Sequence, residues 1–134
     1  MRPHRLILAL IGAALLLVAC GGDAATVAFT RVDAPTFQAE AQADPDGVII
    51  DLRTDEEIAA GYIEGAVQLD FYEPTFAASL EELDPDVHYL VYCNSGNRSA
   101  QAIRMMKDAG FTTVTELDGG IQAWNAAGLP TVTP

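Results

Sequence analysis

The residues with the clearest chemical potential lie at positions 93–99, which read Cys-Asn-Ser-Gly-Asn-Arg-Ser. They follow a β-rich run at 87–92 and precede a helical pattern that begins near Arg98. A cysteine between a strand and a helix start lies close to unpaired backbone amides and to the positive end of the helix dipole. Both stabilise a thiolate and lower the thiol pKa below the roughly 8.5 of free cysteine. Cys93 is therefore the candidate nucleophile.

The rest of this loop suits a bound anion. The amides of residues 94–98 can form a concave nest, and Gly96 allows the backbone angles that such a curl needs. Arg98 falls in the first helical turn, where the dipole disfavours a cation by roughly 0.3–1 kcal/mol. An anionic sulfur species or the Cys93 thiolate would offset that cost, and so would an ion pair with a carboxylate. The sequence leaves both explanations open.

The elements that must position the loop alternate between short β-rich runs and helical patterns. This alternation predicts an α/β fold with a mostly parallel central sheet covered by helices. Strands are expected at 26–30, 48–50, 66–69, 87–92 and 111–117, and helices at 34–43, 55–60, 74–83, 98–109 and 122–127. In such sheets ligands bind beyond the carboxyl ends of the strands, which is where the loop falls.

Local signals support two of these helices. Asp33 precedes an Ala-Pro pair, which suits a cap followed by a first-turn proline. Thr54 and Glu57 have the spacing of a capping box, in which each residue bonds the backbone amide of the other.

The first 22 residues have the layout of an export signal. Arg2 and Arg5 precede an apolar run at 6–18, and small residues surround Cys20. The run is shorter than the roughly 20 residues that span a bilayer, so a permanent transmembrane anchor is the less favoured interpretation.

Residues 17–20 read Leu-Val-Ala-Cys and resemble a bacterial lipobox. That resemblance implies cleavage before Cys20 and lipidation of its side chain; the alternative is an ordinary export signal that contains a cysteine. We expect a signal peptide at 1–19, a lipidated cysteine and short tether at 20–25, and a folded domain at 26–134. The protein is then an exported, membrane-anchored lipoprotein.

Charge and cysteine content narrow the function further. The formal net charge is −12, and removal of Arg2 and Arg5 with the signal peptide lowers it to −14, because all 19 acidic residues follow the cut. Such a domain repels nucleic acid, so no nucleic-acid partner is expected. If Cys20 is lipidated, Cys93 has no partner in the chain. An unpaired thiol in an exported protein indicates reactivity, with a buried inert cysteine as the alternative.

Four segments together resemble the single-domain rhodanese family. Residues 93–99 are similar to its active-site loop, and 48–53 (Val-Ile-Ile-Asp-Leu-Arg) to its central strand. Residues 61–66 (Gly-Tyr-Ile-Glu-Gly-Ala) and 117–124 (Leu-Asp-Gly-Gly-Ile-Gln-Ala-Trp) are similar to two further signatures. The segments occur in the family's order and span essentially all of residues 26–130.

The resemblance implies a three-layer rhodanese-like fold of about five strands and a sulfurtransferase activity. Cys93 would take the outer sulfur of a donor as a persulfide and pass it to a thiol or a cyanide-like acceptor. The substrate would be held by Asn94, Ser95, Gly96, Asn97, Arg98 and Ser99. The mechanism requires no cofactor and no metal, and nothing in the sequence requires more than a monomer.

Three positions depart from the family pattern. Asn94 stands where relatives often have arginine, which removes one positive charge and weakens the case for the thiosulfate dianion as an efficient donor. Tyr62 replaces the usual histidine and Leu52 a usual valine, and neither position is the nucleophile.

Other functions remain as alternatives. The related cysteine phosphatases have five residues between cysteine and arginine, whereas Cys93 and Arg98 are separated by four, which disfavours phosphatase activity. A sulfur carrier or interaction module with little turnover is the main alternative. Thiol–disulfide exchange usually needs a second nearby cysteine, which this chain lacks.

Six further residues receive structural interpretations. Asp51 and Arg53, at a strand end, are expected to pair with each other or with loop backbone. Trp124 is expected to be a packing anchor, Met105 and Met106 core filler, and His88 a structural or edge residue of its strand.

Overall fold

The computed structural model describes residues 26–134. The predicted signal peptide, Cys20 and the tether lie outside these residues, so the predictions made for them stay predictions. Within residues 26–134 no helix has the length and apolar character needed to cross a bilayer.

The centre of the fold is a five-stranded sheet in which every pair of neighbouring strands is parallel. The order β1-β5-β4-β2-β3 places β4 in the middle, with β1 and β3 at the edges. The strands are β1 Ala28–Val32, β2 Val48–Asp51, β3 Val67–Gln68, β4 His88–Tyr92 and β5 Thr113–Leu117. The predicted α/β class and mostly parallel sheet are therefore confirmed.

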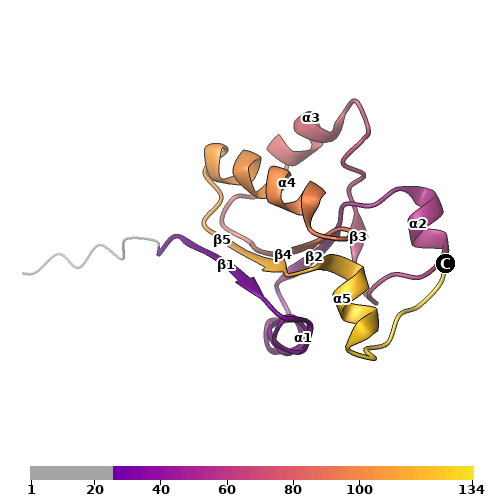
Figure 1. Cartoon of the computed structure of the whole chain (residues 1–134). Helices are drawn as coiled ribbons and strands as arrows, with labels where there is room; N and C mark the ends of the chain where they lie inside the picture. Colours follow the sequence, from indigo (N-terminus) through magenta and orange to yellow (C-terminus); the bar gives the residue numbers. More distant parts are fainter. Residues whose placement is uncertain (1–25) are drawn as a thin grey trace, which may run out of the picture.

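Helices cover both faces of this sheet, as predicted. They are α1 Ala34–Ala43, α2 Asp55–Ala59, α3 Phe76–Glu81, α4 Asn97–Asp108 and α5 Gly120–Ala126. Helices α3 and α4 lie on one face and α1 and α5 on the other, while α2 lies near the C-terminus (Figure 1). The result is the expected three-layer arrangement.

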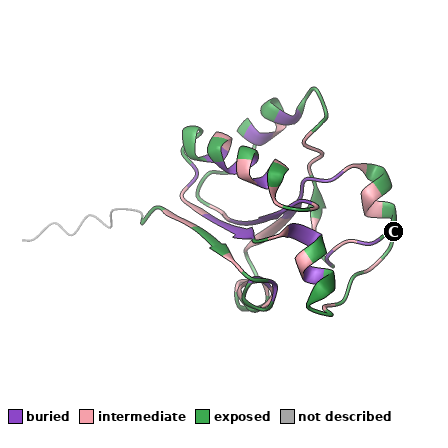
Figure 2. Cartoon of the chain, viewed as in Figure 1, coloured by how far each residue is buried: buried purple, intermediate pink, exposed green. Residues whose placement is uncertain are grey.

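The alternation of side chains along β4 decides which face receives the nucleophile. Tyr89 and Val91 belong to the core under α3 and α4, whereas Leu90 and Tyr92 belong to the core under α1 and α5. Because successive side chains of a strand point to opposite faces, Cys93 falls on the α4 side. Strand β4 is buried on both faces, as the purple centre of Figure 2 shows.

The α1–α5 face is held by aromatic packing. The ring of Phe37 meets those of Tyr92 and Trp124 edge-on, with centroids 6.4 and 6.3 Å apart. The indole N–H of Trp124 donates to the Pro130 carbonyl at 2.9 Å. Trp124 is therefore a packing anchor, as expected, and Met106, 1% exposed, is core filler on the opposite face.

Several element boundaries differ from the predicted ones. Strand β1 starts two residues later than expected and continues to Val32, because it pairs along its full length with β5. Helix α3 starts at Phe76 rather than residue 74, since two successive turns between Asp70 and Phe76 precede it. Helix α5 starts at Gly120, two residues earlier than expected.

Candidate active site

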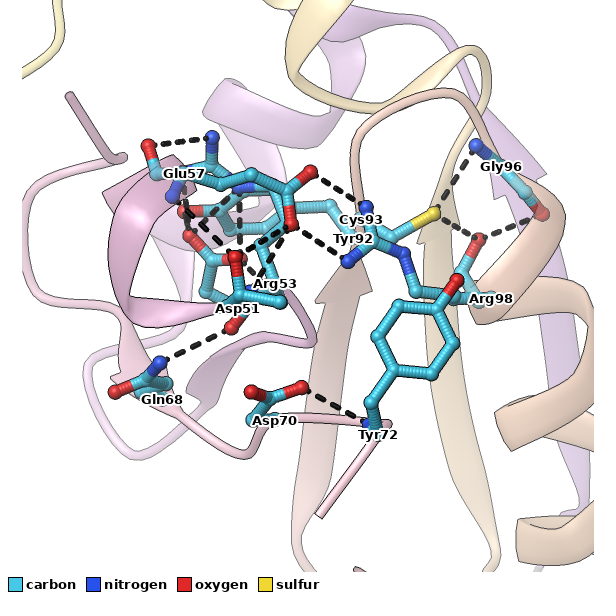
Figure 3. Close-up of polar contacts among 12 residues, drawn as sticks. Asp51, Arg53, Glu57, Gln68, Asp70, Tyr72, Tyr92, Cys93, Gly96 and Arg98 are labelled. Atoms are coloured by element: carbon cyan, nitrogen blue, oxygen red, sulfur yellow. Dashed lines mark hydrogen bonds and ion pairs between the residues drawn. The ribbon is translucent and has the colours of Figure 1, made fainter. Parts of the chain in front are cut away.

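Cys93 directly follows β4 and is only 1% exposed. Its sulfur accepts a hydrogen bond from the Gly96 amide at 3.1 Å (Figure 3). Within residues 26–134 it is the free cysteine that the structure contains, and it forms no disulfide there. A buried sulfur of this kind depends on the protein, not on water, for stabilisation of its charge.

The start of α4 supplies that stabilisation. Gly96 precedes the helix with a φ of 104°, a conformation that favours glycine and turns the chain back toward the sulfur. Burial by itself would raise the pKa of the Cys93 thiol, but hydrogen bonds that the ionised sulfur can accept from the Ser99 amide and hydroxyl and from the Gly96 and Ser95 amides outweigh it. The thiol pKa is consequently below its usual value, which is what a nucleophilic cysteine requires.

Helix α5 fixes the other side of the loop. The amides of Ile121 and Gln122 donate to the carbonyls of Cys93 and Asn94 at 2.9 and 3.2 Å. This close backbone approach explains Gly120, which has a φ of 61° and whose place could not accept a side chain. A Cβ there would lie 2.5 Å from the Asn94 oxygen.

The Arg98 side chain reaches Glu57 of α2. Its two terminal nitrogens meet the two Glu57 oxygens at 2.7 and 2.6 Å (Figure 3), and its guanidinium lies 5.2 Å from the centre of the Tyr72 ring. The bond to Arg98 is the main reason that the Glu57 pKa falls from 4.5 to about 2. Of the two explanations left open for Arg98, the carboxylate ion pair is the one observed.

A buried network positions α2 and with it Glu57. Asp51 binds Arg53 through both carboxylate oxygens and accepts a hydrogen bond from the Tyr92 hydroxyl at 2.5 Å. Arg53 in turn donates to the carbonyls of Glu57 and Gly61 at 3.3 and 2.8 Å. Asp51 and Arg53 therefore have the structural role that was predicted: they pair with each other and tie the loop backbone to the sheet.

Ser99 and Glu116 lie beneath the cysteine. Ser99 is fully buried, and its hydroxyl oxygen is 3.6 Å from the Cys93 sulfur and 2.7 Å from a Glu116 oxygen. Glu116, on β5, is 5% exposed and was not singled out from the sequence. The available signal was a lone carboxylate in an otherwise uncharged strand.

The structure distributes the six loop residues predicted to bind substrate over different tasks. Amides of Ser95, Gly96 and Ser99 face the sulfur, Asn94 contacts α5, and Asn97 begins α4. Their binding roles stay predictions.

His88 is remote from this loop in its contacts: its ring nitrogens meet Asp44 and Thr115 at 2.9 and 3.0 Å. No cluster of three or more His, Cys, Asp or Glu side chains in residues 26–134 is arranged to hold a metal ion.

Comparisons with known proteins agree with this geometry. The rhodanese-like domain model matches residues 34–127. A sulfurtransferase of Allochromatium vinosum is 35% identical over 78% of this chain and 95% of its own length. The thiosulfate sulfurtransferase GlpE of Stutzerimonas stutzeri is 35% identical over 72% of this chain and 84% of its own length.

Solved structures give the same picture. A rhodanese-related protein from Thermoplasma volcanium superposes with a TM-score of 0.69 at 25% identity, covering 78% of this chain and 99% of that one. A Rhodopseudomonas palustris protein described as a possible tyrosine phosphatase superposes with a TM-score of 0.63 at 26% identity, covering 78% of this chain and 85% of that one.

The contact between α5 and the cysteine loop predicts the effect of Gly120→Ala. The added methyl group meets two loop carbonyls and strains the left-handed backbone, so unfolding free energy should fall by about 2–5 kcal/mol. Alkylation of Cys93 at pH 7 should also slow, because the amide cradle shifts. Chemical denaturation and iodoacetamide kinetics measure the two effects.

The matched control is Gly128→Ala. Gly128 has a φ of 72° but no atom within 4 Å of its missing Cβ, so only the backbone strain of about 1–2 kcal/mol remains. Equal losses in the two variants would show that the close approach of α5 is unimportant.

Proposed function

Because the chain belongs to the rhodanese-like family, we propose that it is a sulfurtransferase in which Cys93 carries the transferred sulfur as a persulfide. The observation that carries the proposal is the buried Cys93 sulfur facing the amides at the start of α4. The sulfurtransferase names of the relatives support the same reaction class.

The reaction divides into two displacements at sulfur. The Cys93 thiolate attacks the outer sulfur of the donor, so that a new S–S bond forms and the donor's own bond to that sulfur breaks. The leaving group, sulfite from thiosulfate or a thiolate from a persulfide, departs with the electron pair. An acceptor thiolate or cyanide then attacks the outer sulfur and restores the Cys93 thiolate.

The backbone of the loop suits the charge that appears in the intermediate. A persulfide anion carries its charge on the outer sulfur, one bond further from the strand than Sγ. No side chain among the described residues caps the start of α4, and the amides there face the sulfur, so they are placed to stabilise that charge. Neither displacement needs a general base, because the attacking groups are already anionic.

The charge around the loop bears on the donor. Asn94 contributes no charge, and the charge of Arg98 is neutralised by Glu57. A thiosulfate dianion therefore meets little net attraction, whereas a polysulfide or organic persulfide brings less charge and depends more on the amides. We assign the donor to sulfane-sulfur compounds, with persulfides and polysulfides preferred over thiosulfate.

The same features favour a second candidate, a sulfur carrier with little turnover. The Cys93 sulfur is almost inaccessible, and a partner protein that opens the loop can load and discharge it directly. Phosphatase activity is disfavoured, because the loop is one residue short for phosphate and Arg98 is occupied by Glu57.

The first prediction concerns the nucleophile. The protein should transfer sulfur to cyanide from at least one of thiosulfate, polysulfide or glutathione persulfide, and Cys93→Ser should abolish the transfer. Intact-mass measurement should show the native chain heavier by one sulfur atom after donor treatment, and the variant unchanged. A native chain that gains no sulfur from any of the three donors would exclude the sulfurtransferase, and a persulfide discharged only to a protein partner would indicate the carrier.

The second prediction concerns Glu57→Gln, which keeps the shape of the capping side chain but frees the charge of Arg98. The KM for thiosulfate should fall by roughly threefold to tenfold, corresponding to about 0.7–1.4 kcal/mol of added attraction. The matched control is an alkyl persulfide as donor, which carries at most one negative charge and loses its outer sulfur to Cys93 with a thiolate as leaving group, so its KM should change by less. An equal change for both donors would show that charge is not the cause.

We also propose that the protein is an exported lipoprotein anchored through Cys20, on the strength of the apolar run and the lipobox-like segment at 17–20. The full chain expressed in bacteria should partition into membranes, begin at Cys20 and carry lipid by mass spectrometry. Cys20→Ala should lose both lipid and cleavage at that site. A native chain that still retains residues 1–19 would contradict the proposal.

A further inference from the structure

Glu116 is a buried carboxylate next to the nucleophile that the sulfur-transfer reaction does not use. One of its oxygens accepts a hydrogen bond from the Ser99 hydroxyl at 2.7 Å. The other accepts from the Arg31 Nε at 2.8 Å. A buried charge is costly without such partners, so each of these two bonds matters for its presence there.

The hydroxyl of Ser99 has one proton and several acceptors within reach. The Glu116 oxygen is 2.7 Å away, the Gly96 carbonyl 3.1 Å and the Cys93 sulfur 3.6 Å. The shortest bond goes to the carboxylate, and charge-assisted bonds are the stronger ones. The lone pairs of the Ser99 oxygen then face the sulfur, which suits an S–H donor and opposes a thiolate.

Arg31 is the second hydrogen-bonding partner of Glu116. It lies opposite Glu116 in the β1–β5 ladder, and its side chain is 56% exposed while that of Glu116 is 6% exposed. The pair lies at a surface groove of about 290 Å³ that Arg104 and Lys107 also line. Three of the five Lys and Arg residues at 26–134 thus gather behind Glu116, in a strongly acidic domain.

We propose that Glu116 is a positioning residue that competes with the Cys93 thiolate for the Ser99 hydroxyl proton, and that Arg31 sets the strength of this competition. The proposal deepens the proposed function and rests on it only in taking Cys93 as the reacting thiol. When the thiol ionises, the hydroxyl must turn from Glu116 to the sulfur. When the persulfide forms, the charge moves to the outer sulfur and the hydroxyl returns to Glu116.

This competition has a chemical consequence for the enzyme. By taking the Ser99 proton, Glu116 makes the Cys93 thiolate less stable than it would be otherwise. The persulfide anion is less affected, because the loop amides stabilise the charge on its outer sulfur. Thiolates of higher pKa are intrinsically better nucleophiles. The competition therefore lowers the fraction of Cys93 that is ionised but raises the reactivity of each thiolate. It also favours the loaded state of Cys93 over the empty one.

Two other charged groups act on Cys93 and Arg31, and the variants used in the test do not alter them. Arg98, held by Glu57, acts on Cys93 from α4, and Asp118 acts on Arg31 from the end of β5. Variants at Glu116, Arg31 and Ser99 leave these groups unchanged.

The experiment measures the ionisation of Cys93 in the full chain. Iodoacetamide alkylation is followed against pH by mass spectrometry of the peptide that contains Cys93, which excludes any contribution from Cys20. Glu116→Gln should lower the midpoint of the alkylation–pH curve by about one pH unit, because the Ser99 hydroxyl can then donate to the thiolate. Arg31→Gln should raise it, and Arg31→Lys should restore most of the native value.

A double-variant comparison separates the proton competition from direct repulsion. In the background of Ser99→Ala, Glu116→Gln should shift the midpoint by less than half as much as it does in the native chain. An undiminished shift would mean that Glu116 acts on the thiolate directly through space. An unchanged or raised midpoint in Glu116→Gln alone would show that Glu116 does not compete for the Ser99 proton. Either result overturns the proposal.

Arg104→Gln is the matched control, because it removes a charge from the same groove without touching Glu116. Its midpoint should not move, and a shift equal to that of Arg31→Gln would overturn the specific role of Arg31. Arg31 is exposed, so its variants keep the test decisive if Glu116→Gln fails to fold. The readout needs no sulfur donor, so its failure and the failure of the proposed function are distinguishable.

Discussion

A sulfur that is shielded from water can carry negative charge only if the protein supplies the hydrogen bonds that water would otherwise give. The Cys93 sulfur is shielded in this way, and the loop around it is arranged to supply those hydrogen bonds. Strand β4 delivers the residue to the α4 face, Gly96 reverses the chain, and the first amides of α4 turn toward the sulfur. Because the donors are backbone groups, the site depends more on chain path than on side-chain identity.

That chain path is held from both sides. Helix α5 binds the loop carbonyls with its own first amides, an approach close enough to require Gly120. On the other side, the Asp51–Arg53–Tyr92 network ties α2 to the sheet, and α2 presents Glu57 to Arg98. The loop is thus fixed by two helices and one buried ion pair.

The electrostatics of the site balance opposing effects. Backbone amides favour the Cys93 thiolate, and burial opposes it. The positive side chain within the loop, Arg98, is matched by a carboxylate instead of being left for substrate. The positive charge available at the loop is consequently lower than the loop sequence suggests.

The layers, the parallel sheet, the capping box at Thr54 and the candidate nucleophile could all be predicted from the order of residues, because they depend on side-chain periodicity and on residues only a few positions apart. The sequence did not determine helix ends such as that of α3, where successive turns replaced the first helical turn.

The carboxylate that pairs with Arg98 became known only from the folded chain, since Glu57 is 41 residues away and the sequence contains 19 acidic residues. The contact between Glu116 and Ser99 could not be predicted either, because it depends on how β5 packs under α4. Periodicity assigns a residue to a face, whereas the partner across an interface depends on strand order and helix placement. For this reason the candidate nucleophile could be named from the sequence, whereas the charged groups packed around it could not.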